Sequence, residues 1–192
     1  RGGARGRLVR RLTHCLISLG AAYYWIPAQL PLLQISKWVI LVLALLAVTI
    51  LEIWRIRRSR LMLGMRPHER GRVASYFYAV TASVLVLAFA PMEVGVPAIV
   101  AMAVTDPIVG ETRLRTGSES LAIVVSAACY AIIATTALLA IGVSGSTAMI
   151  LVLVMSPVAV ASEAIDIRGL DDDFTMLLFP ALVGGAVLMF IA

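Results

Sequence analysis

The sequence predicts an all-α membrane protein, a polytopic bundle of about seven transmembrane helices, and three observations lead to this prediction. Of the 192 residues, 61% are hydrophobic and 14% are charged, and the mean hydropathy is +0.98, values that exclude an ordinary soluble domain. The apolar residues form seven continuous runs, without the alternation that barrel strands require. The charged residues gather in alternate connecting segments. We therefore expect residues 1–192 to form a single integral membrane domain.

The seven runs are separated by short segments that contain proline, glycine or charged residues. A helical bilayer crossing takes about 20 residues, and several runs are shorter, so flanking residues are expected to complete them. Although five arginines precede the first run, as in a signal peptide, no small-residue cleavage site follows, and we expect a retained helix. The runs are Leu12–Ile26, Ile35–Trp54, Val73–Ala90, Val94–Val109, Leu121–Val143, Thr147–Ala161 and Phe174–Ala192.

Basic residues lie almost entirely on one set of connecting segments. Lysine and arginine number five before the first run, seven between the second and third, two between the fourth and fifth, and one between the sixth and seventh. The opposite set contains only Lys37. The positive-inside rule makes the first set cytoplasmic, which predicts a cytoplasmic N-terminus, an external C-terminus and a polar site on the cytoplasmic face.

Asp106 lies near the cytoplasmic end of the fourth run, directly before Pro107. Because proline disfavours helical geometry at the preceding residue, we expect the chain to unwind at Asp106 and to line a cavity there. An acid at membrane depth is costly, which favours function over helix capping or pairing with an arginine. Asp106 is therefore expected to act as a metal ligand or as a base.

Arg113 and Arg115 lie in the short polar segment that precedes the fifth run. Two guanidinium groups beside a helix N-terminus suit a phosphate clamp. Their residue type fits a purely topological role on the basic side equally well. Ser118 or Ser120 is expected to cap the helix that follows.

Acidic residues dominate the segment between the sixth and seventh runs. Mg²⁺ prefers oxygen ligands and binds together with phosphates, so Glu163, Asp172 and Asp173 are expected to serve with Asp106 as metal ligands. The alternative is a solvated acidic loop in which Asp172 or Asp173 caps the last helix. The charged residues of this segment are Glu163, Asp166, Arg168, Asp171, Asp172 and Asp173.

Three further residues are secondary candidates for the site. His14 lies about one turn into the first run, Glu52 lies near the end of the second run three residues before Arg55, and Glu111 follows Gly110. We expect His14 and Glu52 to be buried polar residues paired with neighbours. A pH-sensitive base at His14 is the functional alternative.

Four short motifs follow one another on the face predicted to be cytoplasmic. They are Arg10-Arg11-Leu12-Thr13-His14, Arg66-Pro67-His68-Glu69-Arg70-Gly71, Thr105-Asp106-Pro107-Ile108-Val109-Gly110, and Glu163-Ala164 with Gly169-Leu170-Asp171-Asp172-Asp173-Phe174-Thr175. In this order they resemble the motifs of the small polytopic CTP-dependent lipid-alcohol kinases, which include dolichol kinase, phytol kinase and the fungal CTP-dependent diacylglycerol kinase. The chain has Thr105 where that family has glycine, and Thr116-Gly117-Ser118 where it has Gly-Lys-Ser.

The resemblance implies a membrane kinase that transfers the terminal phosphoryl group of CTP, or of another nucleotide, to an isoprenoid or other lipid alcohol from the bilayer, with Mg²⁺ as cofactor. It implies catalytic roles for Asp106, Glu163 and Asp172, and it adds Arg66 and Glu69 to the nucleotide-binding candidates. A CDP-lipid synthase would use similar site parts, and a small transporter or an inactive scaffold is the non-enzyme alternative. No nucleic acid is expected as a partner, and the sequence assigns no oligomeric state.

Overall fold

The computed structural model describes residues 3–31, 34–164, 167 and 169–191, and it confirms the all-helical fold class. Two short 3₁₀ helices, η1 (Ser18–Trp25) and η2 (Pro67–Gly71), accompany the α-helices, and an antiparallel ladder pairs β1 (Gln29–Leu30) with β2 (Ile35–Ser36). The α-helices are α1 (Gly3–Ile17), α2 (Trp38–Arg57), α3 (Ser75–Phe89), α4 (Met92–Thr116), α5 (Glu119–Ala140), α6 (Gly145–Ala164) and α7 (Asp172–Ile191).

Within the described residues, five helices are long and apolar enough to cross a membrane, namely α2, α4, α5, α6 and α7. Helix α3 is apolar but has only 15 residues. The side chains are distributed as in a membrane bundle, because large ones such as Val124 and Leu153 are about two-thirds exposed while Ala98 and Ala134 are fully buried. Small residues at helix contacts let the backbones approach closely. The fold is therefore compatible with a membrane protein.

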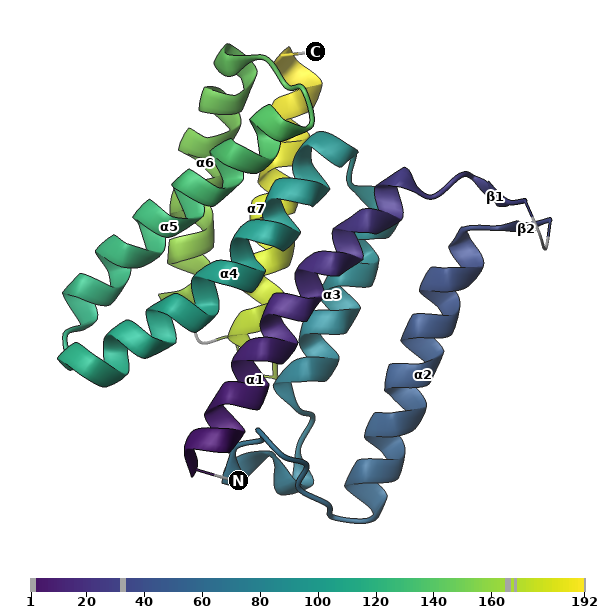
Figure 1. Ribbon diagram of the computed structural model, residues 1–192, viewed down its shortest axis with the longest axis vertical. Coiled ribbons are helices and arrows are strands. Elements are labelled where there is room, and N and C mark those ends of the chain that lie inside the picture. Colours follow the sequence, from purple (N-terminus) through teal and green to yellow (C-terminus); the bar gives the residue numbers. More distant parts are fainter. Residues whose placement is uncertain (1–2, 32–33, 165–166, 168, 192) are drawn as a thin grey trace.

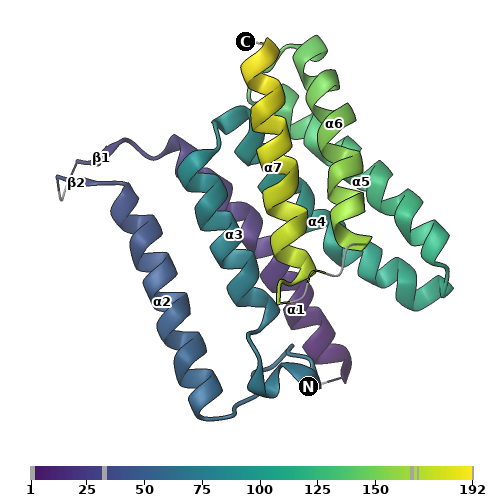
Figure 2. The ribbon, with the colours of Figure 1, turned by 180° about the vertical axis from the view of Figure 1, so that it is seen from behind.

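The helices form two layers (Figures 1 and 2). Helices α1, α4 and α5 form one layer, and α3, α7 and α6 form the other. Helix α4 is central, since it packs against α1, α5 and α7, whereas α2 packs against α3 at the edge of the bundle. The chain runs up and down through the bundle, so that the N- and C-termini lie at opposite ends (Figure 1). The starts of α1, α3 and α7 and the end of α4 consequently share one end.

Two glycines allow close helix packing. At Gly95 in α4, a Cβ atom would overlap the hydroxyl group of Tyr24, which donates hydrogen bonds to the carbonyls of Val86 and Ala90. At Gly184 in α7, a Cβ atom would lie 2.8 Å from the sulfur of Met155 in α6. The contact of Tyr24 with Gly95 and its hydrogen bonds thus hold η1 and α4 close to the end of α3.

The first helix differs from the expected range, Leu12–Ile26. It begins at Gly3 and ends at Ile17, and the chain then continues as the tighter helix η1. The change of helix type coincides with Ser18, whose hydroxyl donates to the Cys15 carbonyl at 2.6 Å. Arg5, Arg7, Arg10 and Arg11 therefore belong to the helix, and the last three take part in the site described next.

Candidate functional site

A polar cleft of about 530 Å³ opens at the end of the bundle that holds the N-terminus. It joins segments that are distant in the sequence, because α1, the loop before η2, the last turns of α4 and the start of α7 all line it. Residues from four separate segments of the sequence therefore meet at this end of the bundle. Its arginines are Arg7, Arg10, Arg11, Arg66 and Arg113, and its acids are Asp106 and Asp172.

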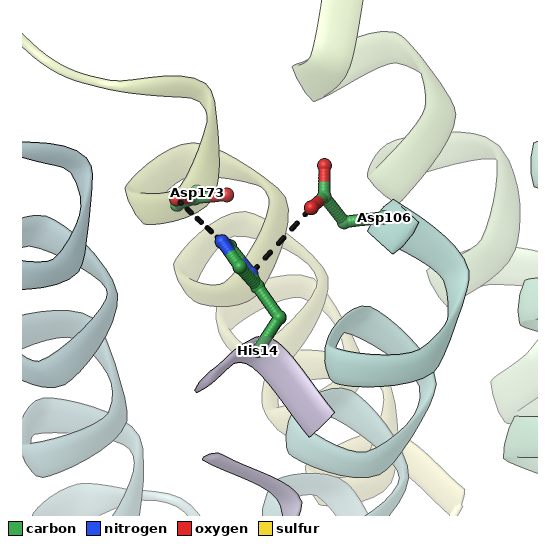
Figure 3. A group of neighbouring side chains, drawn as sticks. All are labelled: His14, Asp106 and Asp173. Atoms are coloured by element: carbon green, nitrogen blue, oxygen red, sulfur yellow. Dashed lines mark ion pairs between the residues drawn. The ribbon is translucent and has the colours of Figure 1, made fainter. Parts of the chain in front are cut away.

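His14 lies between two carboxylates at the base of this cleft (Figure 3). Its Nδ1 atom is 3.5 Å from Oδ2 of Asp106, and its Nε2 atom is 3.7 Å from Oδ2 of Asp173. His14 comes from α1, Asp106 from α4 and Asp173 from the first turn of α7. His14 is 5% exposed and Asp173 is fully buried. Three helices therefore meet at one imidazole with an acid on each side.

The His14, Asp106 and Asp173 cluster fits a divalent cation. One ligand atom from each residue lies within 4.8 Å of the others. Neither oxygen of Asp173 nor Nδ1 of His14 has a hydrogen-bond partner among the described residues. Buried polar atoms normally have partners, and a cation bound by the two carboxylates and the imidazole would satisfy these atoms. Water molecules from the cleft could complete the coordination of Mg²⁺ or Mn²⁺.

The chain does not unwind at Asp106, so that expectation is wrong. Helix α4 continues from Met92 to Thr116 with Pro97 and Pro107 inside it. Eleven of its residues are buried, and packing on three sides outweighs the local preference of a residue before proline. Asp106 reaches the cleft from a regular helix, on the turn that also presents Pro107 and Gly110 to it.

The acids of the loop before α7 take different places. Asp173 joins the His14 cluster and Asp172 lines the cleft. Asp171 accepts hydrogen bonds from the Ser75 hydroxyl and from the Asp173 amide, so it caps α7 and ties it to α3. Burial, aided by the adjacent Asp172 carboxyl, raises the pKa of Asp171 to about 6. Asp166 and Arg168 lie outside the described residues.

Glu163 lies outside the His14 cluster. Its Oε1 atom is 2.6 Å from Nη1 of Arg113, and its Oε2 accepts a hydrogen bond from Ser126. Arg113 also pairs with the exposed Glu119. Glu163 thus positions an arginine of the cleft.

The two expected clamp arginines point in different directions. Arg113 lines the cleft, whereas Arg115 is 77% exposed and pairs with Glu111, one turn earlier in α4. Glu111 also pairs with Arg11 of α1 and so joins the two helices. Ser118 caps α5 by accepting a hydrogen bond from the Leu121 amide, as expected.

Three arginines of the cleft form no ion pair with any described residue: Arg7, Arg10 and Arg66. From the sequence, Arg7 counted only among the topological charges and Arg10 belonged to a family-like motif, but neither was expected as a site residue. Their spacing carries a signal, because Arg7, Arg10, Arg11 and His14 stand at positions i, i+3, i+4 and i+7 of one helix face. This face is the wall of the cleft.

A buried polar network fixes the loop that presents Arg66. Arg55 is fully buried, forms a bidentate pair with Glu52, and donates to the backbone carbonyls of Arg60, Glu69 and Arg72. Glu52 also accepts hydrogen bonds from the Tyr76 hydroxyl and the Ala74 amide.

Glu69 supports the same loop from its other side. It accepts hydrogen bonds from the Arg66 amide and from Ser75. Glu52 and Glu69 therefore shape the loop, and Arg66 alone among these candidates lines the cleft.

Searches of protein-family models, curated proteins and solved structures found no match to this chain.

Proposed function

We propose that the chain is a membrane-embedded kinase that transfers the terminal phosphoryl group of CTP, or of another nucleoside triphosphate, to the hydroxyl group of an isoprenoid or other lipid alcohol. One observation carries the proposal: three arginines that form no ion pair with a described residue line one cleft together with His14 and Asp106, two members of the His14, Asp106 and Asp173 cluster, at the end of an apolar bundle. Arginines bind phosphate oxygens through charge-assisted hydrogen bonds, and the cluster suits the cation that accompanies a triphosphate.

The membrane placement is part of the proposal. All seven helices would cross or enter the bilayer, with α1 and α3 completed by flanking residues. The cleft, with its arginines, would face the cytoplasm by the positive-inside rule. A water-soluble nucleotide would then reach the cleft directly, and a lipid alcohol would arrive from the side.

Different residues of the cleft would have different roles in phosphoryl transfer. Arg7, Arg10 and Arg66 would bind the phosphates, and Arg113, held by Glu163, would add a fourth fixed guanidinium. The acceptor oxygen forms a bond to the terminal phosphorus, the bond to the bridging oxygen breaks, and the nucleoside diphosphate leaves with that electron pair. Asp106, whose carboxylate is partly exposed in the cleft, would take the hydroxyl proton. A cation bound by the acidic cluster would neutralise the charge on the phosphates.

The test is incubation of purified protein with Mg²⁺, a lipid alcohol and CTP labelled at either its α- or its γ-phosphate. We expect γ-label in the lipid and CDP as the other product. Asp106→Asn should lower turnover by at least ~100-fold, whereas Glu93→Gln, in the first turn of the same helix at the opposite end of the bundle, should not. Transfer of α-label from CTP to a lipid phosphate, with release of pyrophosphate, would instead identify a CDP-lipid synthase.

A further inference from the structure

A second pocket adjoins the cleft on the other side of His14. It has a volume of about 140 Å³ and lies between α1, the loop before η2 and the first residues of α3. Arg10, His14, Gly64 and Met65 line both the pocket and the cleft. The two spaces are therefore neighbours separated by a wall that includes the imidazole of the candidate site.

The lining of this pocket is divided between apolar and polar groups. Met62 and Leu63, 40% and 56% exposed, form its apolar part together with Met65. Its polar part contains Glu69 and the Ser75 hydroxyl, both buried and hydrogen-bonded to each other, together with Arg10, Thr13, His14 and Tyr76. A small apolar group that carries one hydroxyl matches such a lining.

One row along α1 connects the lipid-facing surface with both spaces. Leu16, Thr13, Arg10 and Arg7 follow one another at intervals of three residues, so they are neighbours on the helix surface. Leu16 is 61% exposed, Thr13 lines the pocket only, Arg10 lines both spaces and Arg7 lines the cleft only. The row leads from an apolar side chain past the pocket to the phosphate-binding arginines.

On the basis of the proposed function, we infer that this second pocket is the acceptor subsite and receives the hydroxyl-bearing terminal unit of the lipid alcohol. Its size supports this assignment, since an apolar cavity of about 150 Å³ in another protein holds benzene. A terminal isoprene unit with its hydroxyl group has the same number of heavy atoms. The remainder of the lipid would leave past Met62 and Leu63 toward the exposed leucines of α1.

Thr13→Trp tests the acceptor subsite, because an indole at this exposed position would occupy the mouth of the pocket without touching the cleft. The matched control is Leu12→Trp, at an exposed position of the same helix that lines neither space. We expect Thr13→Trp to raise the KM for a short isoprenoid alcohol by ~10-fold or more and to leave the Kd for CTP within ~2-fold. Leu12→Trp should change neither value.

A binding measurement separates this inference from the kinase proposal. Farnesol carrying a diazirine next to its hydroxyl end should, without nucleotide, label residues 62–65 or 13 in the wild type and should label Thr13→Trp far less. Labelling that is unchanged by Thr13→Trp would overturn the acceptor subsite, even if kinase activity is found. Specific labelling of the pocket in a protein without kinase activity would retain the alcohol site and reject the proposed reaction.

Discussion

Arg113 in α4 is held by Glu163 in α6, with 2.6 Å between Nη1 and Oε1. The pair joins a cleft arginine to a carboxylate that is almost fully buried, and the Ser126 hydroxyl supports that carboxylate from α5. The geometry assigns Glu163 the positioning of a guanidinium, a role different from the metal ligation that its place in the sequence suggested.

The first prediction concerns Glu163→Gln, which removes the charge but keeps the hydrogen-bonding shape. We expect the KM and Kd for CTP to rise by ~3–10-fold, because Arg113 loses its buried anchor, while the affinity for Mn²⁺ remains unchanged. Turnover rates at several CTP concentrations give the KM, and calorimetric titration gives the Kd for CTP and the Kd for Mn²⁺. Glu119→Gln is the control, since it removes the exposed partner of the same arginine. Loss of Mn²⁺ binding in Glu163→Gln would make Glu163 a metal ligand after all.

The second prediction concerns the metal cluster. Mn²⁺ should bind the purified protein without nucleotide, and Asp173→Asn should weaken this binding by at least ~10-fold, because it removes the carboxylate of one of the three ligands. Electron paramagnetic resonance of free Mn²⁺ gives the affinity. Glu119→Gln, an exposed acid outside the cluster, should bind Mn²⁺ like the wild type.

Equal Mn²⁺ affinity in Asp173→Asn and in the wild type would reject the metal site. His14 would then lie between two carboxyl groups without binding a cation.

The third prediction concerns Arg55, which holds the loop between α2 and α3. Arg55→Ala should lower the free energy of unfolding by ~3–5 kcal/mol, because the buried Glu52 carboxylate loses its cationic partner and three backbone carbonyls lose the hydrogen bond from Arg55. Arg57→Ala, two residues later and exposed, should change it by less than ~0.5 kcal/mol. Unfolding in mixed detergent micelles, followed by circular dichroism, provides the comparison. Equal stability of the two variants would refute the role of this network.

The fold class could be predicted from the sequence because it depends on composition and on continuous apolar runs. Both properties can be read from short stretches of sequence, and the predicted fold class stays the same when the helix bounds are wrong by several residues. The bounds themselves depend on tertiary contacts, as α1 and Asp106 illustrate. Helix α1 begins at Gly3, in a segment that lines a cleft formed with other parts of the chain, and Asp106 stays helical because α4 is packed on three sides.

The sequence indicated the polar segments of the site but not the grouping of their side chains. Asp106 and Asp173 were among the expected metal ligands, and His14 was expected only as a secondary residue. Their meeting depends on the packing of α1 against α4 and of α4 against α7, which no local pattern contains. The roles of Glu52 and Glu69 likewise follow from hydrogen bonds to backbone atoms of a folded loop.

The last prediction is a pH dependence of stability caused by Asp171. Its pKa is about 6 in the folded protein, above the usual 3.8, because the carboxyl is buried beside Asp172. A raised pKa means that the folded state binds the proton more tightly than the unfolded state. The contribution of Asp171 to stability is therefore greatest below pH 3.8 and is lost as the pH rises through about 6.

Asp171→Asn mimics the protonated carboxyl and should remove this dependence. The variant loses one hydrogen-bond acceptor at every pH, so the informative quantity is the stability difference between variant and wild type at two pH values. Between about pH 4.5 and 7.5, the free energy of unfolding of the variant relative to wild type should rise by about 1–2 kcal/mol. This value is below the full free energy that corresponds to the pKa shift, because solvent screens the partly exposed carboxyl. Thermal unfolding with a chelator present, and with Glu119→Gln as the control, measures the shift. A stability difference that is the same at both pH values would show that Asp171 ionises normally in the folded protein.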